Sequence, residues 1–369
     1  MPAPAMAGAP AAEGQPAGGG AAGANPFWEV TNLFAQPNKQ GAVLATAMGA
    51  APIPGGGQIN PGNYLRGLRL VVRSVGGLGA ATGDNPFNFF AALGMQNTDG
   101  AEILYNVING FAYGMRQRYF RPWLRDPMTA YDFAQSANPS MTVFLQPEVR
   151  HNLGVLENTD TRSQYSWTQT INTAAAVGAT VAAPTVTVTP FVDMWAQPDD
   201  SDLEKVPNQK IPPGANLQTK TRHQTFALNA AGSGNTFLST LQGNAIRGVL
   251  LIVRDSLGNR VDYLTNPIQW TQDQRSLGSL SPDQVWQWEE DQYAPYGVRA
   301  PRPIGIYAFP RFFNPGDLYG QGWLYTANST ALQWESTTLG TGINLPGTVE
   351  LLQEEVYAVG AIDPSLIGI

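Results

Sequence analysis

Short runs of β-branched and aromatic residues, separated by Gly, Pro and Asn, recur along most of the chain and predict strands joined by turns. One of these runs occurs twice. The sequence LRGLRLVVR at residues 65–73 returns as IRGVLLIVR at residues 246–254, with Arg, Gly, Leu, Val and Arg in the same places and mostly apolar exchanges elsewhere. A turn sequence follows each copy, so both copies predict a strand that ends in a turn.

The repeat also predicts which residues are structurally equivalent. Side chains alternate between the two faces of a strand, so two strands with one pattern must turn the same positions toward the core. The pairs expected on this basis are Arg66 with Arg247, Leu70 with Leu251, Arg73 with Arg254 and, further along the two halves, Trp167 with Trp334. Leu70 and Leu251 should both be buried.

A helix is expected after each copy of the strand. In the second half, Ser281 suits the N-cap, Pro282 the first helical position and Gln284 the position that completes a capping box. In the first half, Asp99 and Glu102 resemble a capping box. The apolar residues that follow them at helical spacing are Ile103, Leu104, Val107, Ile108 and Phe111.

Three further strand patterns keep the same order in both halves. Each half has a strand that ends at Pro, then a strand that carries Trp, then a closing strand with an alternating pattern. The segments are 142–147 and 306–310, 165–168 and 332–335, and 185–189 and 349–359. Residues 42–62, which precede the first repeated strand, show little strand pattern. The shared order of all these elements indicates an internal duplication.

Two all-β copies of roughly 150 to 170 residues each match the size of a jelly roll with its loops. We therefore predict an all-β chain of two tandem jelly-roll β-barrels, a double jelly roll, with short helices in the loops. The expected division is an arm at residues 1–25, a first jelly roll at 26–198, a linker at 199–219, a second jelly roll at 220–362 and a tail at 363–369. The arm is almost entirely Ala, Gly and Pro, so it is expected to be disordered in isolation.

Composition and charge narrow the functional classes. Charged residues make up only 13% of the 369 residues, which indicates a surface that is either polar but uncharged or covered by copies of the same chain. The net charge of −7 argues against a protein that wraps nucleic acid. The chain has no Cys and two His, which excludes disulfides, thiolate catalysis and Cys-built metal sites. It shows neither a signal-peptide pattern nor a bilayer-spanning run, so synthesis in the cytoplasm is expected.

The duplicated architecture over residues 27–360 resembles the double jelly-roll major capsid proteins of tailless, membrane-containing double-stranded DNA viruses. The size and the Ala/Gly-rich arm are most similar to the coats of tectivirus-like bacteriophages. The resemblance implies a structural protein of the virion, present in the host cytoplasm during assembly, and not an enzyme. It implies a homotrimer that forms a pseudo-hexagonal capsomer of an icosahedral shell.

The same resemblance implies the partners. They are neighbouring capsomers of the same chain, vertex or minor capsid proteins, and an internal viral membrane that the N-terminal arm could contact. Sequence-specific binding of nucleic acid is not expected.

Two other functions remain as alternatives. A two-domain jelly-roll protein could bind or cleave glycans, with Trp and Tyr side chains stacked on sugar rings. A receptor-binding spike is a third reading, although such a protein would be expected to show a repetitive shaft, which this sequence lacks.

No catalytic, cofactor-binding or metal-binding residue is predicted, and no cofactor. The glycines at residues 77–83 loosely match a dinucleotide loop, but Asp84 and Pro86 do not continue a helix, so a surface turn is expected. His151 and His223 are expected to be polar surface or interface residues, because no nucleophile motif accompanies them.

Two acidic runs are candidates for a cation site or a catalytic site. Asp199, Asp200 and Asp202 could hold a weakly bound cation or belong to a solvated linker. The run at residues 289–291 places its carboxylates next to one another in sequence, which does not supply the two opposed carboxylates of a glycosidase.

Two groups of arginines could bind anions. The first group flanks the repeated strands and comprises Arg66, Arg73, Arg247 and Arg254; its recurrence favours a structural role over phosphate binding. The second is a basic and aromatic cluster formed by Arg116, Arg118, Arg121 and Arg125 with Tyr119, Phe120 and Trp123. Such a cluster can face nucleic acid or a membrane, and packing on a neighbouring subunit is the favoured interpretation.

Overall fold

A computed structural model gives the fold of the chain. It describes residues 36–39, 44–61, 63–75, 84, 87–97, 103–121, 140–147, 156–158, 164–179, 183–195, 217–241, 244–294, 301–309, 323–339 and 344–358. The N-terminal arm, the glycines of residues 77–83, the acidic run of the linker and the C-terminal tail lie outside the described residues.

The first half forms two sheets that face each other. The first outer sheet has the order β1–β10–β4–β7, with β2 also paired to β10 and β8 to β4. Its strands are β1 (Gln36–Lys39), β2 (Leu44–Ala47), β4 (Asn63–Val75), β7 (Ser140–Leu145), β8 (Leu156–Asn158) and β10 (Thr185–Trp195). The first inner sheet has the order β6–β5–β9–β3. Its strands are β3 (Ile53–Ile59), β5 (Phe90–Asn97), β6 (Ile103–Ile108) and β9 (Tyr165–Ile171).

The second half repeats this arrangement. The second inner sheet has the order β16–β13–β19–β11, with β17 also paired to β13, and the second outer sheet has the order β12–β18–β14–β15. The inner strands are β11 (Leu217–Leu228), β13 (Ala245–Arg254), β16 (Ile306–Phe309), β17 (Leu324–Tyr325) and β19 (Gly347–Ala358). The outer strands are β12 (Gly234–Ser239), β14 (Leu264–Gln272), β15 (Arg275–Leu280) and β18 (Leu332–Thr338).

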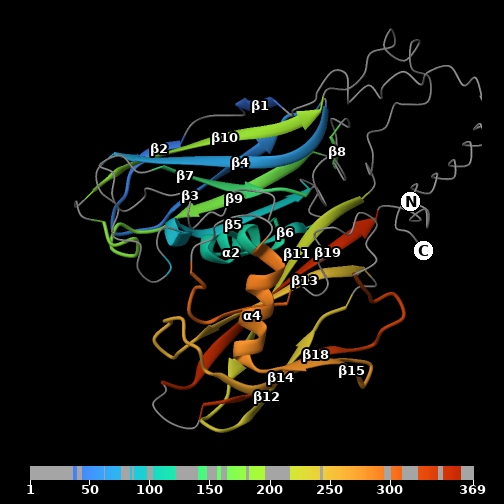
Figure 1. The fold of residues 1–369 in the computed structure, drawn as a ribbon. Coiled ribbons are helices and arrows are strands. Elements are labelled where there is room, and N and C mark those ends of the chain that lie inside the picture. Colours follow the sequence, from blue (N-terminus) through green and yellow to red (C-terminus); the bar gives the residue numbers. More distant parts are fainter. Residues whose placement is uncertain are drawn as a thin grey trace, which may run out of the picture.

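The four sheets are stacked in the order first outer, first inner, second inner and second outer (Figure 1). The two inner sheets are joined where β6 and β11 run parallel, at the pair Tyr105 and Thr221. Helix α2 (Gly110–Phe120) lies between the two halves, and helix α4 (Pro282–Tyr293) runs along the second half (Figure 1). Neither of these α-helices of the described chain is long and apolar enough to cross a membrane.

The register of the repeated strands confirms the duplication. Strand β4 lies between β10 and β7, as β13 lies between β19 and β16. Gly67 is opposite Asp193, and Gly248 is opposite Glu354. In both ladders the preceding residue, Arg66 or Arg247, is skipped by a β-bulge. A shared bulge at one position shows that the predicted equivalence of the two arginines is correct.

The predicted core residues are also confirmed. Leu70 and Leu251 are completely buried and take equivalent places, opposite Val143 and Tyr307. The Trp strands correspond as well, because β9 lies between β3 and β5 while β18 lies between β12 and β14.

Strand β3 explains why residues 42–62 show little strand pattern. Its sequence, IPGGGQI, has glycine where a side chain would normally face the core. A Cβ at Gly57 would lie 2.6 Å from Cη2 of Trp167, so the glycine leaves room for the indole ring. The strand is held by pairing with β9 rather than by its own propensity.

The helix expected in the first half begins later than predicted. Residues 103–108 form strand β6, and the helix starts at Gly110, where the Asn109 side chain accepts a hydrogen bond from the Ala112 amide at 2.8 Å. Paired apolar positions fit both a helix and a strand in so short a run, and pairing with β5 decides for the strand.

Helix α4 is confirmed, because Ser281 and Gln284 form the reciprocal capping box and Pro282 opens the helix. The linker boundary at residue 219 is wrong by a few residues. Strand β11 already begins at Leu217, where it pairs with Ala358 of β19.

The equivalent leucines provide a stability test. Replacing either Leu70 or Leu251 with Ala is expected to lower the free energy of unfolding by about 2 to 5 kcal/mol, because each leaves a cavity in a close-packed core. Chemical denaturation measures the change, and Leu238→Ala, on an exposed side chain of β12, is the control. A loss at Leu251 no larger than at Leu238 would contradict the equivalence.

Candidate functional site: the interface between the two rolls

Helix α2 joins the two rolls. All eleven of its residues are buried. A Cβ at Gly114 would overlap the ring of Phe87, so the glycine lets the helix lie directly on the short helix η1 (Phe87–Phe89). The other side of the helix faces β13 and β19 of the second half. Helix α2 therefore acts as a spacer packed between the first and second inner sheets.

The second inner sheet completes the apolar side of this interface. Five of its side chains belong to the core of the first half and are completely buried: Leu250, Ile252, Ile306, Ala308 and Leu352. At Gly248 a Cβ would overlap the ring of Phe120, so this glycine permits the close approach of the helix to β13. The two rolls thus share one continuous core rather than a thin contact.

A buried ion cluster lies within this core. The Glu354 carboxylate is completely buried and contacts Arg116 at 2.8 Å and Arg247 at 2.5 Å, and it also binds the guanidinium of Arg121. We call these four residues the Glu354 cluster. Arg116 and Arg121 come from the first half, whereas Arg247 and Glu354 come from the second, so the cluster bridges the two rolls.

Polar groups around the cluster accept further hydrogen bonds from two of the guanidinium groups. Arg121 donates to the Gln146 carbonyl at 3.0 Å and to the Thr219 hydroxyl at 2.9 Å. Arg247 donates to the Phe120 carbonyl at 3.0 Å. These bonds offset the loss of water from the buried charges and fix the orientation of the helix on the sheet.

Burial and neighbouring charges shift the pKa values of two of the cluster's arginines and of the adjacent Tyr105. Burial lowers the pKa of Arg116, but Glu354 together with Tyr105 and Tyr113 outweighs burial, so this pKa is raised. Burial dominates at Arg247 and lowers its pKa, and burial raises the pKa of Tyr105, beside Arg116, to about 12. A guanidinium does not lose its proton in proteins, so these arginines and Tyr105 exchange no proton near neutral pH. The cluster is therefore suited to holding a geometry rather than to acid–base catalysis.

A second ion cluster lies nearer the surface of the same interface. We call it the Glu350 cluster; its members are Glu350, Arg254, His223, Asn109 and Asp84. The Glu350 carboxylate contacts Arg254 at 2.6 Å and His223 at 3.2 Å, and accepts from the Asn109 side chain at 3.3 Å. Arg254 also pairs with Asp84 at 2.7 Å. Burial raises the pKa of Glu350, but the bonds to His223 and Arg254 outweigh it and hold this pKa below its usual value.

Helices α2 and α4 make a third contact. The Tyr293 hydroxyl donates to the Tyr119 carbonyl, and the two rings pack edge to face at 5.8 Å. Burial and then the carboxylate of Glu289 raise the pKa of the Tyr119 hydroxyl well above its usual value. Glu289 is itself buried and faces this contact rather than solvent.

The structure corrects the interpretation of the basic and aromatic cluster. Arg116, Arg118 and Arg121 are at most 4% exposed, so they face neither nucleic acid, nor a membrane, nor a neighbouring subunit. They lie inside the chain because α2 is covered on both sides. Arg125 and Trp123 lie outside the described residues.

The other candidate residues are the repeated arginines, the two histidines and the glycine and acidic runs, and only some of them lie within the described residues. The structural role expected of the repeated arginines is confirmed for Arg247 and Arg254, which both pair with carboxylates. His223 lies on β11 at the Glu350 cluster, within the interface. Within the described ranges, no group of His, Asp and Glu could hold a metal ion. His151 and residues 77–83 and 199–202 lie outside these ranges.

Sequence analysis missed Glu350, Glu354 and Thr219. A signal was present for the carboxylates, because charged residues interrupt the apolar pattern of the closing strand at 349–359. Charged residues on both faces of a strand indicate that at least one is buried and paired. The partners of these two carboxylates could not be read from the sequence because each lies at least 96 residues away along the chain.

Comparisons with known proteins agree on the fold. No family model and no curated protein matches the sequence. Among solved structures, the STIV MCP is similar with a TM-score of 0.61 and 14% identity, over 89% of this chain and 100% of that one. The capsid of the virus PBCV-1 gives 0.57 and 10%, over 87% and 94%.

A third solved structure is similar over the same extent. The major capsid protein P2 from bacteriophage PM2 gives a TM-score of 0.51 and 10% identity, over 86% of this chain and 98% of that one. The chain therefore has the double jelly-roll fold. Both halves and their stacking are included in the similarity, since each match covers most of both chains.

The Glu354 cluster yields a stability prediction. Glu354→Gln is expected to lower the free energy of unfolding by about 3 to 5 kcal/mol, because it leaves three guanidinium groups buried without a counter-charge. Chemical denaturation measures the loss. The control is Glu335→Gln on the second outer sheet, which should change stability by less than about 1 kcal/mol. Equal effects at the two positions would show that the cluster does not hold the rolls together.

The Glu350 cluster yields a pH prediction. A carboxyl group whose pKa is lower in the folded chain stabilises the fold above its unfolded pKa, and this stabilisation is lost as the pH falls through the folded value. Stability should therefore fall as the pH drops below the ordinary glutamate value of 4.5. Glu350→Gln should cost about 1 to 3 kcal/mol at pH 7 and much less at pH 3.

Thermal unfolding at a series of pH values measures this effect. Glu335→Gln again serves as the control and should follow the pH dependence of the unmodified protein. A Glu350→Gln protein with an unchanged pH dependence would contradict the assignment.

Proposed function

We propose that the chain is the major capsid protein of an icosahedral virus and has a structural role. The observation that carries this proposal is the extent of the fold similarity, which includes nearly the full length of the STIV, PBCV-1 and PM2 capsid proteins. The similarity covers at least 86% of this chain and at least 94% of each of those proteins. Low charge supports the same conclusion, because much of the surface of a coat subunit is covered by other copies.

In this proposal three copies form a homotrimer with six rolls, which tiles the shell as a pseudo-hexagonal capsomer. The capsomers belong to the virion of a tailless bacteriophage with an internal membrane, and the chain is present in the host cytoplasm before assembly. Neighbouring capsomers and vertex or minor capsid proteins are further partners. The Ala/Gly/Pro arm becomes ordered against neighbours or lipid on assembly, because leaving it disordered beforehand costs little free energy. The chain has no enzymatic role and no sequence-specific contact with nucleic acid.

The glycan-binding alternative is not favoured by the indole rings. A sugar platform needs an exposed aromatic face, whereas Trp167, Trp270 and Trp334 are at most 5% exposed. Trp286 stacks on Tyr307 and lies under the Arg302 guanidinium, so its ring faces are occupied by the chain itself.

Light scattering of the purified full-length protein tests the proposal. A stable trimer is expected, and it should persist with a chelator and a thiol reductant, since nothing in the Cys-free sequence calls for either a disulfide or a structural metal. Negative-stain images should show flat, six-lobed particles. A monodisperse monomer at micromolar concentration would contradict the proposal, and a glycan-binding assay would then be the next experiment.

A further inference from the structure

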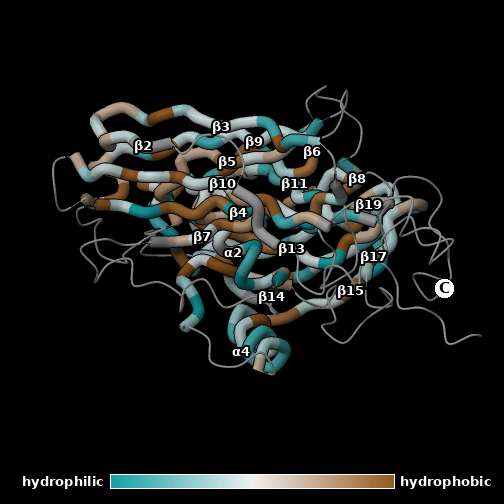
Figure 2. Tube along the Cα trace, turned by 90° about the horizontal axis from the view of Figure 1, so that it is seen from above, coloured by the Kyte–Doolittle hydropathy of each residue, from teal (hydrophilic) through white to brown (hydrophobic). Residues whose placement is uncertain are grey.

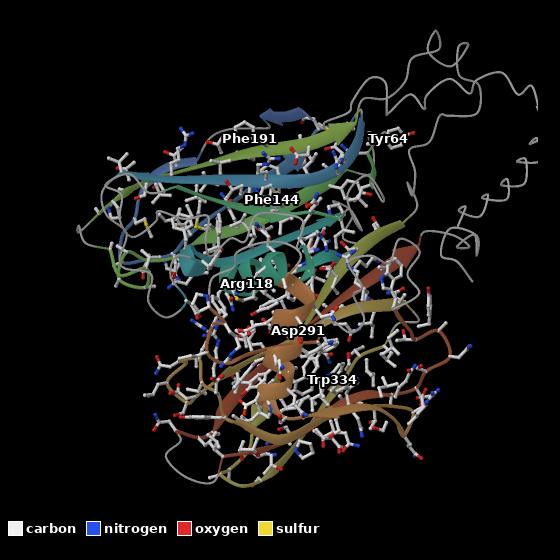
Figure 3. The ribbon with its side chains drawn as sticks, viewed as in Figure 1. Tyr64, Arg118, Phe144, Phe191, Asp291 and Trp334 are labelled. Carbon is white, nitrogen blue, oxygen red and sulfur yellow. The ribbon has the colours of Figure 1, made fainter. Side chains whose placement is uncertain are left out.

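One sheet of the duplicated fold is covered inside the chain, whereas no described element lies on the same face of its equivalent. In the second inner sheet, Leu352, Leu250 and Ala308 lie side by side across β19, β13 and β16 and are completely buried against the first half. The equivalent row in the first outer sheet crosses β10, β4 and β7 and consists of Phe191, Arg69 and Phe144. This row lies at the far side of the stack, away from the second roll (Figure 3).

The open row belongs to a patch that has the composition of a protein interface. We define the sheet patch as Arg69, Val71, Arg73, Phe144 and Phe191. The Arg69 side chain is 32% exposed and its guanidinium lies 5.0 Å from the centre of the Phe144 ring. Arg73 is exposed, and Val71, Phe144 and Phe191 are half-buried. Aromatic residues and Arg are enriched in protein–protein interfaces.

Helix α4 is the equivalent of α2, and it has the open side that α2 lacks. Each helix connects one sheet of a roll to the other. Helix α2 links β6 of the first inner sheet to β7 of the first outer sheet, and α4 links β15 of the second outer sheet to β16 of the second inner sheet. Only Val285, Glu289 and Tyr293 of α4 are buried. Its exposed side is hydrophilic (Figure 2) and comprises Asp283, Gln287, Glu290 and Asp291, which we call the α4 face. Figure 3 labels Asp291 on this helix.

The two helices have opposite charges. Within the chain the basic helix α2, with Arg116 and the cap Arg121, packs on a sheet that carries Glu350 and Glu354. The α4 face is acidic, whereas the sheet patch carries two arginines. The open helix α4 is therefore acidic where the covered helix α2 is basic, and it could meet the arginines of the sheet patch, of which Arg69 is paired with Asp193.

Register indicates a specific ion pair. When the helices are aligned at their N-caps, Asn109 and Ser281, the residue that corresponds to Phe111 of α2 is Asp283 of α4. The guanidinium of Arg254 lies 5.6 Å from the centre of the Phe111 ring, and Arg254 is the equivalent of Arg73. The same packing between copies would bring Arg73 next to Asp283.

We infer that the sheet patch of one copy binds the α4 face of a second copy of this chain, in the way that the second inner sheet binds α2 within one chain. The inference rests on the proposed capsid function and names the surfaces that hold its trimer together. The contact joins two different surfaces, so it is head to tail, and the proposed trimer requires that the rotation between copies closes it into a ring. Two α4 faces repel each other because both are acidic, which disfavours pairing between identical helix faces.

Site-directed cross-linking tests the contact. The chain has no Cys, so single cysteines can be placed without background. Val71→Cys and Gln287→Cys keep every charge and lie in the sheet patch and the α4 face. The two full-length variants, with different tags, are co-expressed and treated with a short bis-maleimide. A cross-link between copies is expected when both variants are present, and none with either variant alone.

The control replaces Gln287→Cys with Thr236→Cys, an exposed position on the edge strand β12, and should give no cross-link with Val71→Cys. Trimers whose two cysteines at 71 and 287 fail to cross-link would overturn the inference while leaving the proposed function intact. A chain that stays monomeric would contradict the proposed function, and the inference with it.

A charge exchange gives an independent readout. Arg73→Asp and Asp283→Arg should each raise the dissociation constant of the trimer about tenfold, because each brings like charges together. The double variant should recover most of the affinity, since it restores an opposite-charge pair. Sedimentation velocity over a dilution series measures all three proteins. Equal or greater weakening in the double variant would overturn the assigned pair.

Discussion

The burial of one sheet face under helix α2 is the constraint on which the remaining structure depends. That burial places the Glu354 carboxylate in a dry core, where a single charge would be strongly destabilising. Three guanidinium groups from the two halves of the chain balance this charge. The β-bulge at Arg247 and the glycine at position 248 allow the sheet and the helix to approach closely enough for these contacts. The same cluster makes the docking specific, because apolar packing by itself would tolerate other orientations of the two rolls.

The two halves share one fold because of the duplication, but their equivalent sheets differ in burial. Both ladders keep the bulge and place a carboxylate opposite the following glycine, Asp193 in one half and Glu354 in the other. Glu354 is fully buried, whereas Asp193 pairs with a partly exposed Arg69. Divergence on the outward faces of equivalent sheets has thus made one face a core surface and left the other as a polar and aromatic surface. This asymmetry is consistent with the ordered stacking of rolls that the proposed coat function requires.

Much of the fold could be predicted from the sequence, and the errors have identifiable causes. Helix α4 was found because its signal is local: Ser281, Pro282 and Gln284 form a cap within one turn. The start of α2 was wrong because residues 103–108 have apolar positions that fit both periods, and only pairing with β5 selects the strand. Arg116, Arg118 and Arg121 were read as a surface cluster because nothing local distinguishes a buried guanidinium from an exposed one. The missing information was the position of Glu354, on a strand of the other roll.

The sequence by itself determined the duplicated all-β architecture, the equivalence of Arg66 with Arg247 and the buried places of Leu70 and Leu251, because strand periodicity and repeated register are local properties of the chain. The tertiary structure alone decided which copies of the equivalent surfaces are covered. Which face is covered depends on charged groups and rings from distant parts of the chain that meet in the fold, such as Arg121 with Glu354 and Phe120 with Gly248. Pairing across such distances leaves no periodic trace in the sequence, since a buried ion pair needs complementary neighbours in space and not along the chain.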